Sequence, residues 1–216
     1  MNRRGWLSVL AVIVIAVISG YLLWKLMYDT QSLGEFGLVG VFIASMLSHL
    51  TVVARDMFVP LFIPLASIYH PVILGTFAGT GGAIGEVTTY FLGWGVAESM
   101  EKSASEDRIA RWITKYGLWA VLLVSMTPLP DTPIVLLAGT RKLPFRRLLL
   151  VEIIGKSALY SLGAFLGGFV YTGLEDMLGQ VLASVIVVIG SLIFSILVTW
   201  KPTRDWVFSW IEKFIN

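Results

Sequence analysis

The segment Ser125–Gly139, SMTPLPDTPIVLLAG, places three prolines and one aspartate inside an otherwise apolar run. Proline lacks a backbone N–H, and its ring clashes with the preceding helical turn, so each proline frees backbone polar groups that lipid cannot satisfy. An uninterrupted membrane helix is therefore excluded for this segment. Broken backbone of this kind is tolerated at membrane depth only where protein or a water-filled cavity surrounds it.

The rest of the chain indicates that the surrounding medium is a bilayer. Of its 216 residues 56% are hydrophobic and 14% are charged, and the mean hydropathy is +0.82. A bilayer core needs about 20 apolar residues for one helical crossing. Four runs are long enough: Trp6–Met27, Pro71–Ala97, Leu148–Tyr171 and Leu178–Trp200. The first run exceeds the apolar core of a secretory signal, so we expect it to be retained. We predict a single-domain, all-α polytopic membrane protein with four membrane-spanning helices.

Two further apolar stretches, Val39–Ser67 and Leu118–Gly139, each contain an acid and helix-breaking prolines. We expect both stretches to enter the membrane and return to the same side as re-entrant helical hairpins. The prolines predicted to break them are Pro60, Pro64, Pro128, Pro130 and Pro133.

The distribution of basic residues supports this topology. If Leu118–Gly139 crossed the membrane, the loops 98–116 and 141–147 would carry four bases each on opposite sides, against the positive-inside rule. With both stretches re-entrant from opposite faces, 13 of the 16 bases lie on the cytoplasmic side together with both termini. The segment 171–176, YTGLED, becomes an acidic outer loop. We expect residence in the cell membrane.

The two broken stretches also resemble each other. The sequences ARDMFVPLFIPLAS and LPDTPIVLLAGT align so that Asp56 matches Asp131, each followed by an apolar run with proline. Together with opposed directions of entry, this indicates an inverted repeat, in which broken helices meet near the midplane around a substrate. We therefore expect Asp56 and Asp131 to approach one another around a central cavity.

The organisation along the chain follows from these elements. We predict an N-terminal helix and outer loop (1–33), a first repeat (34–97), a cytoplasmic loop (98–116), a second repeat (117–171) and a last helix with its tail (172–216). The tail sequence RDWVFSWIEKF repeats aromatic residues every four positions, which favours a C-terminal interfacial helix.

Two segments resemble a known family. The glycine-rich segment of the DedA/VTT superfamily, once called SNARE-associated Golgi proteins, is similar to GTFAGTGGAIGEVTTYFLGWGVAE of this chain. The proline region of that family and its following helix resemble TPLPDTPIVLLAGTRKLPFRRLLLVEIIGKSALYSLGAFLGG. The resemblance covers roughly residues 34–171. It implies paired re-entrant hairpins and movement of lipids across membranes: undecaprenyl phosphate in bacterial members and phospholipid scrambling in eukaryotic ones, often with proton dependence.

The chain also departs from that family. Many bacterial members carry an arginine on each side of the second re-entrant proline. If Pro128 is that proline, the corresponding positions here hold Ser125 and Asp131. The chain therefore resembles a divergent member without the arginine pair, and this weakens any transfer of phosphate recognition from the family.

Six ionisable residues are expected at membrane depth, and an ionised group there costs about 2.5 to 3.5 kcal/mol each, or about 15 to 20 kcal/mol together if unpaired. Each of these groups must therefore pair with an opposite charge, take up or release a proton to become neutral, or be hydrated by water. Fully ionised, they carry two positive and four negative charges, so binding of an anionic head group would require protonation of some carboxylates. The predicted substrate or proton pathway comprises Arg55, Asp56, Glu86, Asp131, Glu152 and Lys156.

Structural interpretations of these residues stay open beside the functional ones. Glu152 and Lys156 are spaced to form an i,i+4 pair on one helix, and Arg55 has a side chain long enough to reach the surface. Glu86 lies among glycines, where close packing would bury it. Asp131 precedes a Thr-Pro helix start and suits an N-cap. If it is only a cap, Asp131→Asn would leave transport unchanged.

The sequence favours transport over other classes of function. There is no cysteine, and His49 and His70 alone do not make a histidine metal site, so we expect no metal and no cofactor. The clustered bases fit membrane topology and not nucleic-acid binding.

We expect a lipid flippase or scramblase, acting on polyprenyl phosphate or phospholipid, with membrane lipids and protons as partners. A proton-coupled small-ion or metabolite carrier is the alternative. An intramembrane enzyme is disfavoured because no Gly-x-Ser-x-Gly or His-Glu-x-x-His pattern is present.

Overall fold

The computed structural model describes residues 3–28, 30–52, 55–99, 113, 115–129 and 131–179, with isolated positions from 181 to 202. The predicted all-α class is confirmed: these residues form helices and contain no strand. The loop 98–116 and the tail lie mainly outside the described residues. The elements are α1 (Arg3–Tyr28), α2 (Thr30–Leu50), the short 3-10 helix η1 (Arg55–Phe58), α3 (Val59–Leu65), α4 (Pro71–Gly85), α5 (Val87–Ser99), α7 (Leu118–Ser125), α8 (Thr132–Thr140) and α9 (Phe145–Leu178).

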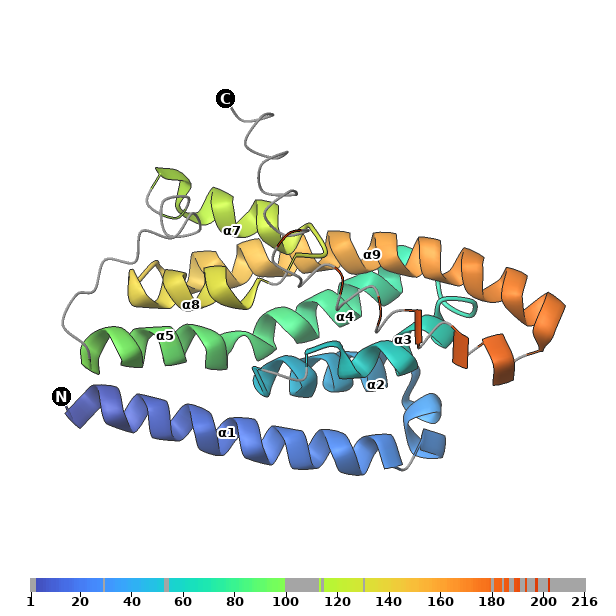
Figure 1. The fold of residues 1–216 in the computed structure, drawn as a ribbon, viewed down its shortest axis with the longest axis horizontal. Coiled ribbons are helices and arrows are strands. Elements are labelled where there is room, and N and C mark those ends of the chain that lie inside the picture. The colour runs from blue at the N-terminus through green and yellow to red at the C-terminus, as the bar shows by residue number, and fades with distance from the viewer. Residues whose placement is uncertain are drawn as a thin grey trace.

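The helices run roughly along one common axis (Figure 1). Helices α4 and α5 follow one another end to end through the middle, with α1 along one side and α9 along the other. Helix α2 packs between α1 and α4, while α8 packs against α5 and α7 against α9. Helices α2, α4, α5 and α8 thus lie between the long helices α1 and α9, whereas α7 lies on the other side of α9.

Two described helices are long and apolar enough to cross a membrane. They are the stretch Gly5–Lys25 within α1 and the whole of α9, Phe145–Leu178. The predicted first helix, Trp6–Met27, falls inside α1. Many of their large apolar side chains are exposed, as expected for surfaces that face lipid tails.

The third predicted span, Pro71–Ala97, is two helices and not one. Helix α4 begins with the His70 side chain accepting a hydrogen bond from the Val72 N–H at 3.3 Å, and Pro71 occupies its first turn. Helix α4 ends at Gly85, and α5 begins at Val87. Glu86 is the junction residue, so the break places an acid where the helical segment changes direction.

Each of the two proline-containing stretches is a helix, a break and a second helix. In the first, α2 ends at Leu50, and η1 and α3 follow from Arg55. Val52 adopts a φ of 66°, a strained conformation for a β-branched residue. In the second, α7 and α8 are separated by residues 126–131, of which Pro130 lies outside the described residues.

The predicted breaking prolines occupy different places. Pro128 lies in the break before α8, and Pro133 lies in the first turn of that helix, where the missing N–H costs nothing. Pro60 lies in the first turn of α3, and Pro64 lies inside that short helix.

The prediction of a loop at residues 171–176 is wrong, because this segment is helical. Helix α9 continues through it to Leu178, beyond the expected end at Tyr171, and stops at Gly179, whose φ of 79° favours glycine. Gly173 alone does not break a helix, and the segment 171–176 contains no proline. Of the predicted span Leu178–Trp200, Leu178 therefore belongs to α9, and most of the remainder lies outside the described residues.

Close helix packing depends on small residues. On α4, Gly75 and Gly79 face Ser161 and Ser157 of α9, and a Cβ on either glycine would overlap serine backbone atoms. This is the small-xxx-small arrangement by which membrane helices approach closely. Gly93 of α5 and Gly139 of α8 make a second such contact, each against the other helix's backbone.

Candidate functional site

Among the residues that the structure describes, five charged side chains from four parts of the fold meet in the interior. We name them the charge cluster: Arg55, Glu86, Asp131, Glu152 and Lys156. Arg55 begins η1, Glu86 lies between α4 and α5, Asp131 precedes α8, and the other two are on α9. All five were predicted from the sequence as pathway residues. The structure brings three residues at helix interruptions together with two from the continuous helix α9.

Arg55 joins the first broken stretch to the second. Its Nη2 contacts carboxylate oxygens of Glu86 and Asp131, and its Nη1 donates to the Thr132 hydroxyl. Its backbone carbonyl accepts a hydrogen bond from the Ser48 hydroxyl at 2.5 Å, which fixes η1 against the end of α2. The guanidinium therefore turns inward to these partners, and the side chain is only 14% exposed.

Lys156 lies at the centre of the three acids. Its Nζ contacts Asp131 Oδ2 and lies 3.4 Å from Glu86 Oε1 and 3.6 Å from Glu152 Oε2. The i,i+4 pair expected with Glu152 is present, yet it is the longest of these contacts. Lys156 thus connects α9 to the start of α8 and to the α4–α5 break.

The charge cluster is largely buried, and Arg55 is its most exposed member. The exposed fraction is 0% for Glu152, 1% for Glu86, 2% for Lys156 and 6% for Asp131. The Arg55 side chain is 14% exposed. Because buried charges are costly unless paired, the mutual contacts of Arg55, Lys156, Asp131 and Glu86 offset part of the cost of burying these groups.

Asp131 occupies the N-cap position of α8 but does not act as a cap. No side-chain capping hydrogen bond is present, and its backbone angles are already helical. Its two carboxylate oxygens face Arg55 and Lys156. The local sequence pattern correctly marks a helix start there, but the carboxylate is directed to two cations from elsewhere in the chain.

Several buried polar atoms of the described residues have no hydrogen-bond partner. They include Arg55 Nε, Glu86 Oε2 and both carboxylate oxygens of Glu152, with the hydroxyls of Thr89 and Ser157. Native interiors leave few such atoms unpaired, and each needs an explanation. In the charge cluster they are the atoms available for a proton, a water or a substrate group.

A second polar contact lies beside the charge cluster. His49 Nδ1 lies 2.8 Å from the Ser45 carbonyl, and its Nε2 lies 3.0 Å from the Tyr160 hydroxyl. Since a carbonyl only accepts, Nδ1 carries the proton in the neutral ring and Nε2 accepts from Tyr160. Both ring nitrogens are occupied, as expected for a satisfied buried histidine.

The remaining predicted residues have different outcomes. The Asp56 side chain lies outside the described residues, so its approach to Asp131 stays a prediction, although its neighbour Arg55 reaches Asp131. The Ser125 side chain is buried, and its hydroxyl donates within α7 to the Val121 carbonyl at 2.9 Å.

Two residues that contact the site, Thr132 and Tyr160, were not predicted from the sequence as site residues. Tyr160 follows Lys156 by four residues on α9, a spacing that places both on one face.

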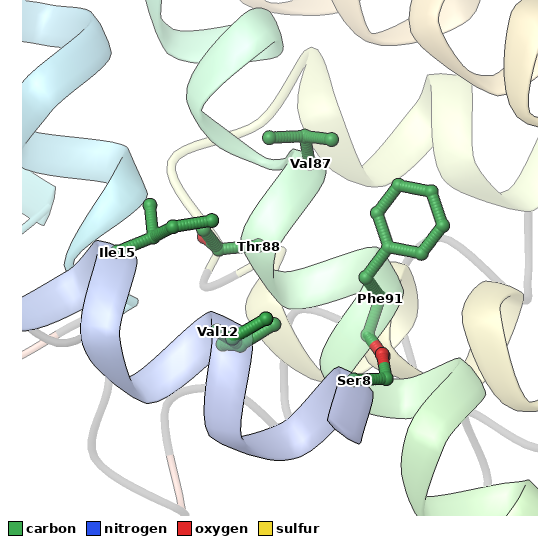
Figure 2. Close-up of a pocket in the computed structure, with 7 residues that line it drawn as sticks. Ser8, Val12, Ile15, Val87, Thr88 and Phe91 are labelled. Atoms are coloured by element: carbon green, nitrogen blue, oxygen red, sulfur yellow. The ribbon is translucent and has the colours of Figure 1, made fainter. Parts of the chain in front are cut away.

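A separate apolar groove of about 220 Å³ lies between α1 and α5 (Figure 2). It is lined by Ser8, Ala11, Val12, Ile15, Val87, Thr88 and Phe91. Its two hydroxyls are already used, because Ser8 donates to the Phe91 carbonyl at 2.9 Å and Thr88 to the Leu50 and Gly85 carbonyls at 3.1 Å. The groove therefore offers apolar surface to whatever occupies it.

A metal centre finds no support in the part of the chain that the structure describes. No group of three or more His, Asp or Glu side chains is placed to hold a metal ion there. The acids of the charge cluster face cations instead.

Comparison with protein families gives one match. The model of the VTT domain matches residues 57–169, more than half of the chain, and this range contains every member of the charge cluster except Arg55. Comparisons with curated proteins and with solved structures found no match. The chain therefore belongs to the VTT-domain family, the DedA/SNARE-associated Golgi protein family, whose members are generally membrane proteins.

Proposed function

We propose that this protein moves lipids across the membrane as a flippase or scramblase, with the lipid head group passing through the charge cluster. The observation that carries the proposal is the meeting of five largely buried charged side chains among the described residues, three of them at helix breaks and two on α9. Broken helices that converge on buried charges are the usual construction of substrate sites in membrane transporters.

Energetics favour a functional role for these charges. If all five groups were ionised at membrane depth, they would cost on the order of 12 to 18 kcal/mol before pairing, taking about 2.5 to 3.5 kcal/mol for each. Pairing offsets part of this cost, but well-packed apolar residues commonly stabilise an interior as well or better. A cluster kept despite this cost is expected to serve binding, and membrane-embedded ionisable groups commonly do.

We further propose the topology that the sequence predicts. The crossings are α1, the α4–α5 pair, α9 and the run to Trp200, and the two broken stretches enter from opposite faces and return. Both termini and most bases then lie on the cytoplasmic side of the cell membrane. In this arrangement Arg55 and Asp131 each begin the returning half of one hairpin, and their contact joins the two hairpins at the midplane.

The cluster supplies the groups that a phosphate head requires. Arg55 and Lys156 are cations suited to phosphate oxygens, and arginine can bind two of them at once. To reach them, a phosphate must take the place of a carboxylate, and the displaced acid is stabilised when it takes up a proton. Polyprenyl phosphate and phospholipid both present such a head, so the proposed exchange applies to either and couples transport to protons.

The groove between α1 and α5 favours a lipid over a small ion. Its walls are apolar and its hydroxyls are engaged, so an acyl or prenyl chain can lie in it without burying an unpaired polar group (Figure 2). Val87 and Thr88 in its wall directly follow Glu86 of the charge cluster. We propose that the tail lies along this groove while the head group approaches the cluster. The proposal is transport and not catalysis.

Transport in proteoliposomes tests the proposal. Purified protein is reconstituted with lipid analogues labelled on the head group, one a phospholipid and one a polyprenyl phosphate, and proton flux is recorded in the same vesicles. The expected result is faster label movement than in protein-free vesicles for at least one lipid. Proton flux driven by a small solute with no lipid movement would favour the small-ion or metabolite carrier instead.

A further inference from the structure

Glu152 differs from the other acids of the charge cluster in having no hydrogen-bond partner. It is 0% exposed, and both of its carboxyl oxygens are unpaired among the described residues. The nearest cation, Lys156 Nζ, lies 3.6 Å from Oε2, which is longer than a hydrogen bond.

The other two acids hold the cations. Asp131 uses one oxygen for Arg55 and the other for Lys156. Glu86 Oε1 contacts Arg55 and lies 3.4 Å from Lys156. These contacts are those of ionised carboxylates.

The charge count singles out the same residue. The described members of the cluster are two cations and three acids, so full ionisation leaves one net negative charge in a largely buried site. An uncompensated buried charge is costly enough that the group takes up a proton instead. A neutral acid restores the balance, and Glu152 is the acid whose neutralisation breaks no short contact.

We propose that Glu152 carries a proton in this structure and is a proton-exchanging group of the protein. The charged and titratable groups that face it are Lys156 on its own helix, Glu86 at the α4–α5 break, Asp131 before α8, and Arg55 of η1. Its protonated state follows from geometry and charge balance, whereas its exchange during transport rests on the proposed function.

Proton release has a direct structural consequence. When water reaches Glu152, its O–H bond breaks, the proton passes to water, and a carboxylate remains 3.6 Å from Lys156. This new carboxylate competes with Asp131 for Lys156. The contact between Lys156 and Asp131, which joins α9 to the start of α8, is thereby weakened. The cluster also gains one negative charge, so an anionic head group binds more readily while Glu152 is protonated.

Infrared spectroscopy of the purified full-length protein in lipid nanodiscs tests the proton directly, without any transport. The expected wild-type spectrum at neutral pH contains a protonated-carboxyl C=O band that is lost in Glu152→Gln. Asp176→Asn, which changes an exposed acid near the end of the same helix, should keep the band. Glu152→Gln should also fold with wild-type thermal stability, because glutamine resembles the neutral acid.

Several results would overturn the proposal. One is a wild-type protein without the band at neutral pH, and another is a band that persists in Glu152→Gln. Failure of Glu152→Gln to fold would also contradict it, because a neutral side chain would then not be tolerated. In proteoliposomes that move lipid, Glu152→Gln should lose most of the pH dependence seen in the wild type. If no lipid moves in any vesicle while the band behaves as expected, the lipid-transport proposal fails and the proton assignment stands.

Discussion

Asp131 shows how a local pattern and a distant partner compete for one side chain. The Thr-Pro sequence after it marks a helix start, and the residue does occupy the N-cap position of α8. Its carboxylate nevertheless faces Arg55 and Lys156, from η1 and α9. The capping interaction can be read from neighbouring residues, but a cation from another element cannot, so the sequence left both interpretations open.

Removing this carboxylate should destabilise the protein. Asp131→Asn leaves Arg55 and Lys156 with Glu86 as their one remaining ionised close partner among the described side chains. Breaking a buried ion pair commonly costs about 3 to 5 kcal/mol. We expect thermal unfolding of the purified variant at a clearly lower temperature than wild type, with Asp176→Asn unchanged. Unfolding at the wild-type temperature would show that the asparagine is accommodated as a simple cap.

The same residues show how much of the site could be predicted. All five members of the charge cluster were identifiable because ionisable residues are rare in apolar runs and need partners. The pairing was not identifiable, since the i,i+4 rule favours Glu152 for Lys156, whereas the structure places Asp131 nearer. Contacts between distant parts of the chain, which the i,i+4 rule does not include, place Asp131 closer to Lys156 than Glu152 is.

At the scale of elements, the interruptions of the two proline-containing stretches were predicted, whereas two helix ends without a nearby proline were missed. Prolines and acids marked the two broken stretches, and both are interrupted in the structure. The end of α9 was missed because the segment 171–176 contains turn-forming residues without a proline. The break at Glu86 was also missed, since its glycines suit close packing as well as a bend.

Glycine packing between α4 and α9 gives a prediction at this scale. A Cβ at Gly79 would overlap the Ser157 backbone, whereas one at Gly163 meets nothing within 4 Å. Overpacking of a tight interface costs about 1 to 3 kcal/mol. We expect Gly79→Ala to lower the unfolding temperature and Gly163→Ala to leave it unchanged or raise it slightly, as measured by thermal denaturation in detergent. Equal behaviour of the two variants would contradict this close α4–α9 contact.

The groove between α1 and α5 gives a second prediction. Ala11 lines it, while the neighbouring Leu10 is 52% exposed and is not among the lining residues. Ala11→Trp should fill the groove and slow lipid movement several-fold, and Leu10→Trp should not. The measurement is the initial rate of labelled-lipid movement in proteoliposomes at equal protein content. Equal rates of lipid movement for both variants would show that the groove is not part of the lipid path.

At the scale of the whole molecule, the proposed topology places both termini on the cytoplasmic side of the membrane. A reporter fused after Asn216 should be cytoplasmic. Because the chain has no cysteine, a single introduced cysteine reports its own side of the membrane. Gly173 on α9 is exposed and has open space around it, so Gly173→Cys should be labelled by an impermeant reagent added outside intact cells. Outside labelling of Ser105→Cys would overturn the topology.

The central claim is that the charge cluster is the path of the lipid head group. The most direct test is the rate of lipid movement by the double variant Arg55→Gln with Asp131→Asn. This variant removes one cation and one acid that contact each other, so the net charge of the cluster does not change. We predict a folded protein whose lipid movement in proteoliposomes falls at least tenfold below wild type. A folded double variant that moves lipid at the wild-type rate would contradict the account.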